Sequence, residues 1–117
     1  MKINLSEQGQ LDKIVSVIRS VVNTERIYLF GSYAYGTPQE DSDFDIYVIY
    51  DEDERPIKVM QRIGLALMYD SAKALDVLAS RLDNFEARCK VSSFERTIRD
   101  KGVILYDREA AGGTALA

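Results

Sequence analysis

Residues 30–46 read FGSYAYGTPQEDSDFDI, and this stretch decides the fold because it joins two structural signals. It begins at the end of Arg26–Phe30, a β-branched and aromatic run that is typical of a short strand and stops at Gly31. It ends by entering Phe44–Tyr50, which is apolar at successive positions apart from one acid. Such a run predicts a central strand covered on both faces.

The turn after the first strand combines a glycine with a hydroxyl residue. Gly31 lets the backbone approach a ligand closely, and a short helical turn that begins at Ser32 would present free amides and a hydroxyl to an anion. A phosphate group would suit this turn. Taken alone, Gly31-Ser32 is better explained as an ordinary strand-ending turn, because glycine is common in turns of every kind.

The acids that follow point to metal-dependent chemistry. Asp43 and Asp45 are two residues apart, so on a strand they face the same side with Cα atoms roughly 6.5–7 Å apart. Two carboxylates at the start of an apolar strand repel each other and are costly to desolvate unless a cation neutralises them. Asp76 supplies a third carboxylate from the apolar run Ala74–Ala79. If the two strands are neighbours, the acids form a cluster that can bind divalent metal, and Asp76 could accept a hydroxyl proton.

Each acid also has a simpler explanation. Exposed acids are common, so Asp43 and Asp45 could merely end a solvated loop. Asp76 could be a buried acid paired with a basic neighbour such as Lys73. The spacing of the acids from Gly31-Ser32 is what favours a site.

Helix and strand patterns alternate along the rest of the chain. Ser92 and Glu95 have the spacing of a capping box, and Gly102 is placed to end that helix in a left-handed conformation. Residues 80–90 are expected to form an irregular connection or a frayed helix. The alternation predicts an α/β (α+β) domain with helices packed on a small mixed β-sheet. The expected helices cover 11–22, 56–69 and 92–102, and the expected strands cover 26–30, 44–50, 74–79 and 103–106.

Length and charge favour one soluble domain. The 117 residues are 46% hydrophobic, which suffices for a single core. We place the domain at 1–108 and expect 109–117 to be a disordered tail. A net charge of −4 disfavours strong nucleic-acid binding, and no run approaches the ~20 apolar residues of a membrane span.

The residue types that are scarce restrict the chemistry further. The chain has no histidine, which excludes Ser-His-Asp triads and His-ligated zinc. Metal would therefore be held by oxygen ligands, which favours hard cations such as Mg²⁺. The single cysteine, Cys89, fits a reducing, cytoplasmic location.

Several separated motifs together resemble one known family. Gly31-Ser32, ten intervening residues and Asp43-Phe44-Asp45 reproduce the signature of polymerase-beta-like nucleotidyltransferases. Leu75-Asp76-Val77 is similar to the segment that carries the family's third acid, and Ile98–Tyr106 resembles its C-terminal ending. The chain resembles the minimal branch of this family, which includes the MntA-like antitoxins of HEPN/MNT systems.

The resemblance implies a polymerase-beta-like nucleotidyltransferase fold and a set of roles. Asp43 and Asp45 would bridge two Mg²⁺ ions, Asp76 would complete one metal site, and Gly31 with Ser32 would hold the β- and γ-phosphates of ATP. The enzyme would move AMP to a hydroxyl acceptor, with a tyrosine of a helical HEPN toxin favoured. The chain would then be the antitoxin of a type VII-like toxin–antitoxin pair, and it could also form oligomers.

One position departs from the family pattern. Tyr35 stands where the family often has Arg or Lys, so a positive charge near the phosphates is missing. Two alternatives therefore stay open. The chain could be a non-catalytic nucleotide-binding module that acts on its partner by contact, or a subunit that modifies aminoglycosides.

Overall fold

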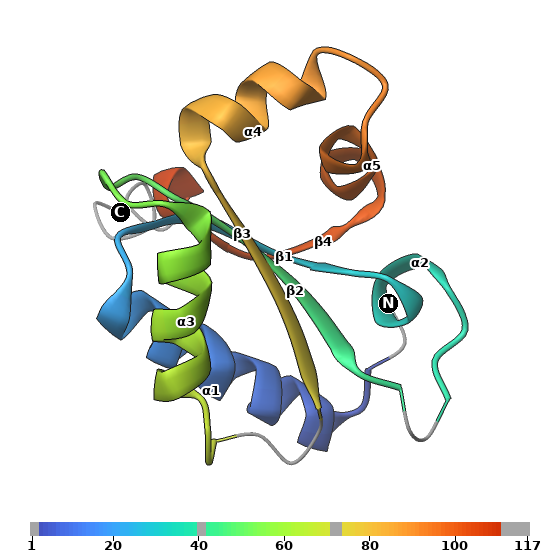
Figure 1. The fold of residues 1–117 in the computed structure, drawn as a ribbon. Coiled ribbons are helices and arrows are strands. Elements are labelled where there is room, and N and C mark those ends of the chain that lie inside the picture. Colours follow the sequence, from blue (N-terminus) through green and yellow to red (C-terminus); the bar gives the residue numbers. More distant parts are fainter. Residues whose placement is uncertain (1–2, 40–41, 71–73, 111–117) are drawn as a thin grey trace.

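The computed structural model describes residues 3–39, 42–70 and 74–110. These residues form one four-stranded sheet with helices on both faces (Figure 1). The expected tail lies outside the described residues from 111 onward. The elements in chain order are α1 (Leu5–Val21), β1 (Thr24–Phe30), α2 (Ser32–Tyr35), β2 (Phe44–Tyr50), α3 (Pro56–Ala66), β3 (Leu75–Arg81), α4 (Leu82–Cys89), α5 (Phe94–Lys101) and β4 (Val103–Asp107).

The sheet is mixed, as the sequence predicted. Its strand order is β3-β2-β1-β4. β1 pairs antiparallel with β2 and β4, whereas β2 and β3 run parallel and are joined by a crossover through α3. Because β2 and β3 are parallel, both strands begin at the same end of the sheet.

Alternate residues of β2 enter two separate apolar cores, which explains why the strand is apolar on both faces. Ile46 and Val48 pack with α1 and α3, whereas Tyr47 and Ile49 pack with α4 and α5. Figure 1 shows the two helix pairs on opposite sides of the sheet. The buried helix residues are Leu11, Ile14 and Ile18 of α1, Val59 and Ile63 of α3, Phe85 and Cys89 of α4, and Ile98 of α5.

Two helices differ from the prediction in extent. α1 begins at Leu5 rather than near Leu11, because Asn4 and Glu7 form a reciprocal capping box. The segment expected to be irregular or frayed contains the regular helix α4, which follows β3 directly. Its buried positions, Phe85 and Cys89, are only one turn apart, so the helical period is hard to read from sequence. None of the helices in the described ranges is long and apolar enough to cross a membrane.

The predicted cap of α5 was wrong by one residue. Ser93, not Ser92, is the N-cap, and its hydroxyl accepts a hydrogen bond from the Arg96 amide (3.1 Å). The shift moves Glu95 out of the capping-box position, and its carboxylate instead receives hydrogen bonds from Arg88 and Tyr47.

Gly102 ends α5, but not in the predicted left-handed conformation. Its φ of −69° and ψ of 166° are extended values that other residues adopt. What requires glycine is close packing, because a Cβ atom here would lie 2.5 Å from the carbonyl oxygen of Ile98 and 3.1 Å from that of Leu29.

A matched pair of glycine substitutions tests this assignment. We expect Gly102→Ala to lower the free energy of unfolding by about 1–3 kcal/mol, because two backbone carbonyls must move. Gly64→Ala, in α3 with open space around it, should raise it by about 0.5–1 kcal/mol. Urea titrations followed by circular dichroism measure both values. Equal effects at the two positions would contradict the packing role of Gly102.

Candidate active site

The three acids selected from sequence lie at one end of the sheet. Asp45 and Asp76 are register partners in the parallel pair of β2 and β3, so their Cα atoms are one strand spacing apart, about 5 Å. Asp43 lies one residue before β2, two positions upstream of Asp45. Asp45 shares its sheet face with Tyr47, and therefore lies on the side that carries α4 and α5.

The charges of these acids act on one another. Asp45 is half-buried, whereas Asp43 and Asp76 are exposed. Burial, then the negative charge of Asp76, then that of Asp43 raise the pKa of Asp45 above the ordinary carboxyl value. A cation beside Asp45 would reverse this effect by favouring its ionised form.

Gly31 and Asp45 are in direct contact. Gly31 has φ 74° and ψ −150°, a conformation that is essentially restricted to glycine. A Cβ atom at this position would lie only 2.1 Å from Oδ2 of Asp45. The Asp45 carboxylate therefore lies against the Cα of Gly31, on the side where a side chain would project.

Ser32 begins the short helix α2, as the sequence argument required. The amides of Ala34 and Tyr35 both donate to the carbonyl oxygen of Gly31, at 3.1 and 3.0 Å. The amide of Ser32 therefore precedes the hydrogen bonds of the helix. Because Ser32 follows Gly31 directly, the turn and the acid cluster lie next to each other in the structure.

The two tyrosines of α2 have different surroundings. Tyr33 is buried, packs against Phe44 with ring centroids 5.0 Å apart, and donates a hydrogen bond to Oε2 of Glu7 (2.8 Å). It anchors α2 to α1. Tyr35 is 44% exposed, so its side chain is available to a ligand that binds at Gly31-Ser32.

The donor set suits a hard cation, although the acids do not yet converge. Among the residues that the structure describes, no group of three acidic or cysteine side chains is arranged to hold a metal ion as it stands. Binding by all three acids requires the side chains of Asp43 and Asp76 to turn toward Asp45, and their exposure leaves them free to do so. Oxygen-only donors fit Mg²⁺ or Mn²⁺.

A polar network around Tyr47, two residues beyond Asp45, was not predicted from the sequence. The hydroxyl of Tyr47 donates to Oε2 of Glu95 (3.2 Å) and is hydrogen bonded to the hydroxyl of Ser80 (3.1 Å). Nε of Arg88 donates to Oε1 of Glu95 at 2.6 Å. Burial raises the pKa of Tyr47 to about 12, and although burial opposes it, the Arg88 hydrogen bond holds the pKa of Glu95 below its ordinary value. No signal in the sequence distinguishes Tyr47 from a purely apolar core residue.

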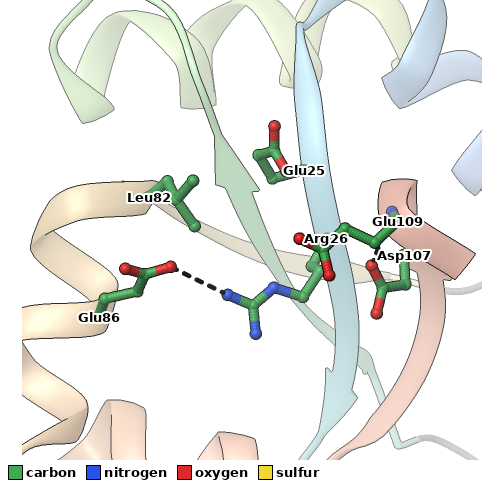
Figure 2. A pocket seen from close by; sticks show the side chains of 6 residues that line it. All are labelled: Glu25, Arg26, Leu82, Glu86, Asp107 and Glu109. Atoms are coloured by element: carbon green, nitrogen blue, oxygen red, sulfur yellow. Dashed lines mark hydrogen bonds and ion pairs between the residues drawn. The ribbon is translucent and has the colours of Figure 1, made fainter.

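A cavity of about 200 Å³ lies at the opposite end of β1. Figure 2 shows Arg26 reaching toward Glu86 of α4, at 3.9 Å, with further carboxylates around the cavity. β1 runs from this cavity toward Phe30, which is the register partner of Asp45. The cavity is therefore separate from the acid cluster, and its mainly acidic lining does not suit a phosphate. It is lined by Glu25, Arg26, Leu82, Glu86, Asp107 and Glu109.

One family model matches most of the chain. This model, described as "Polymerase beta, Nucleotidyltransferase", matches residues 12–111, a range that contains Gly31-Ser32 and all three acids. No curated protein matches the sequence significantly.

Solved structures share the fold at low sequence identity. A candidate nucleotidyltransferase of Sulfolobus solfataricus aligns with a TM-score of 0.62 at 20% identity, over 87% of this chain and 81% of its own. A toxin–antitoxin complex with AMP-PNP aligns with a TM-score of 0.53 at 24% identity, over 86% and 76%. An MntA–HepT toxin–antitoxin complex with two Asp-to-Glu substitutions aligns with a TM-score of 0.54 at 22% identity, over 86% and 76%.

The raised pKa of Asp45 predicts that removing its charge stabilises the protein. Its pKa is raised in the folded state, so the fold favours the protonated form and loses stability as the pH rises from about 3.8 through the folded-state pKa. We therefore expect Asp45→Asn, without divalent metal, to raise the thermal midpoint by a few degrees at neutral pH. The gain should shrink steadily as the pH falls toward 3.8 and below, because a growing share of the wild-type carboxyl is then protonated in both states.

Asp12→Asn is the matched control, because Asp12 is exposed on α1, on the other side of the sheet. Thermal melts of the three proteins from pH 3.5 to 8 make the comparison. Equal stability of Asp45→Asn and Asp12→Asn at pH 8 would contradict the prediction, because burial and the neighbouring acids would then not disfavour the charge of Asp45.

Proposed function

Because the chain belongs to the polymerase beta nucleotidyltransferase family, we propose that it is a magnesium-dependent enzyme that moves AMP from ATP to a hydroxyl acceptor. One observation carries the proposal. The register of β2 and β3 places Asp76 beside Asp45, and Asp45 also contacts Gly31. We name Gly31-Ser32 the phosphate turn. Acids and phosphate turn thus share one end of the sheet.

Each element of the site has a role in this reaction. Gly31 and Ser32 hold the β- and γ-phosphates, with the Ser32 amide and hydroxyl as donors. Asp43, Asp45 and Asp76 would hold Mg²⁺ as a pair of ions, and the bound metal would neutralise charge on the triphosphate.

The transfer itself is an in-line displacement. The exposed carboxylate of Asp76 accepts the proton of the acceptor hydroxyl as that oxygen attacks the α-phosphorus. A new phosphate ester bond forms to AMP, and the bond to the β-phosphate breaks to release pyrophosphate. Asp45, fixed against Gly31, keeps the cluster in register with the phosphate turn.

The acceptor that we propose is a tyrosine of a HEPN-type helical toxin, with this chain as its cytoplasmic antitoxin. Two structural neighbours are toxin–antitoxin complexes, and one of them contains the ATP analogue AMP-PNP. Those neighbours share the fold with this chain, which makes the same pairing a specific and testable expectation.

The direct test is transfer of label from α-³²P-ATP to a HEPN-type partner encoded beside this chain. We expect labelled partner only when Mg²⁺ is present. Asp43→Ala and Asp45→Asn should each lower the rate by about a hundredfold or more, because each removes charge that the site uses. Asp12→Asn, remote from the acids, should retain the wild-type rate.

The alternatives give different results in the same experiment. A module that acts by contact alone would neutralise the partner without labelling it, and Asp45→Asn would neutralise it equally well. Label on an aminoglycoside instead of the partner would identify an antibiotic-modifying subunit. Either result would overturn the proposed acceptor.

Tyr35 offers a second test of the phosphate turn. Introducing a cation by Tyr35→Arg should tighten binding of Mg-ATP by about three- to tenfold, because the exposed position lies on the helix that Ser32 begins. The gain should fall as salt is added. Tyr35→Gln, which adds no charge, is the control in titration calorimetry. Equal affinities for the Arg and Gln variants would place the triphosphate away from α2.

A further inference from the structure

We propose that Phe94, the first residue of α5, is the surface on which the base of the bound nucleotide stacks. The proposal rests on the proposed function, since it assumes that the triphosphate binds at the acids and at Gly31-Ser32. It adds a base-binding position on a different element, α5, and assigns it to a residue that the sequence motifs do not include.

The position of Phe94 follows from the sheet register. Phe30 is the register partner of Asp45, and the two side chains lie on the same face. The ring of Phe94 packs edge-to-face against Phe30, with centroids 5.4 Å apart and an interplanar angle of 89°. It also lies 6.4 Å from the ring of Tyr47, two residues beyond Asp45. Phe94 is thus one side chain away from the acid cluster.

Exposure distinguishes Phe94 from its aromatic neighbours. Phe30 and Tyr47 are 7% and 3% exposed, as expected of core residues, whereas Phe94 is 45% exposed. A single exposed apolar residue is ordinary on a protein surface. Here the exposed ring of Phe94 lies next to Phe30, which directly precedes the phosphate turn. At this place a flat apolar surface could stack on a base.

The chemistry of a nucleotide matches this arrangement. Its charged end is directed to the carboxylate-bound cation and the Ser32 turn, so its base must extend to another part of the same face. Phe30 is one strand spacing, roughly 5 Å, from Asp45, and the ring of Phe94 lies 5.4 Å from the ring of Phe30. The ribose and the α-phosphate can bridge these two steps. Tyr35 is also exposed, but it lies on α2, with the phosphates.

The network around Glu95 holds Phe94 in place. Glu95 directly follows Phe94, and its carboxylate is bound by Tyr47 from β2 and by Arg88 from α4. Ser93, on the other side, caps the helix. The first turn of α5 is therefore fixed on the sheet, and a ring fixed before binding loses little conformational freedom when a base stacks on it. Since every base has a π-face, this surface should favour ATP over other nucleotides only weakly.

The test compares ATP with inorganic triphosphate, which has the charge but no base. With Mg²⁺ present, we expect Phe94→Ala to weaken ATP binding on the order of tenfold and to leave triphosphate binding unchanged. Phe94→Leu, which keeps apolar packing on Phe30 without a π-face, should lose ATP affinity similarly, and Phe94→Trp should keep it. Ile104→Ala removes an equally exposed apolar side chain from β4 and should change neither affinity. Titration calorimetry on the full chain gives all the values.

The outcomes separate this inference from the proposed function. Wild-type ATP affinity in Phe94→Ala, or equal losses for ATP and triphosphate, would overturn the stacking role while leaving the nucleotidyltransferase assignment intact. ATP affinity retained by Phe94→Leu would show that only packing matters, and would also overturn it. If the wild-type chain bound neither ligand, the proposed function would fail and the stacking role with it.

Discussion

The contact between the Asp45 carboxylate and the Cα of Gly31 is the constraint on which the rest of the structure depends. It fixes the end of β1 against the start of β2, and it requires a backbone conformation that only glycine adopts readily. Because α2 begins at the next residue, the same contact sets where Ser32 lies relative to the acids. Any side chain at Gly31 would separate the two halves of the site.

Two apolar cores hold this contact in place. β2 contributes Ile46 and Val48 to one core and Tyr47 and Ile49 to the other, so the strand that carries Asp45 is held from both faces. Burial, and then repulsion by Asp76 and Asp43, raise the pKa of Asp45 and cost stability, and the packing of this strand on both faces offsets that cost. A surface strand with the same acids would instead splay them into solvent.

Much of the fold could be read from sequence because its signals are local. Apolar runs fixed the four strands, and the parallel neighbours that bring Asp45 beside Asp76 were anticipated as a condition of the acid cluster. The predictions for the start and the end of α5 were wrong because residues distant in sequence determine both. Glu95 has capping-box spacing from Ser92, but Arg88 and Tyr47 compete for its carboxylate. Gly102 matches a helix stop, yet the carbonyl of Leu29 is what excludes a side chain there.

The same distinction applies to the site. The spacing of Gly31-Ser32 from Asp43 and Asp45 predicts the charged end of the site, because these residues flank one short connection between β1 and β2. The proposed base-binding position on α5 depends on tertiary contacts, because Phe94 reaches Phe30 only after α4 and α5 pack on the sheet. Under the proposed function, the helix that closes the second core also offers an exposed aromatic ring near the acids, at Phe94. The residues that complete that core would therefore also shape the nucleotide site.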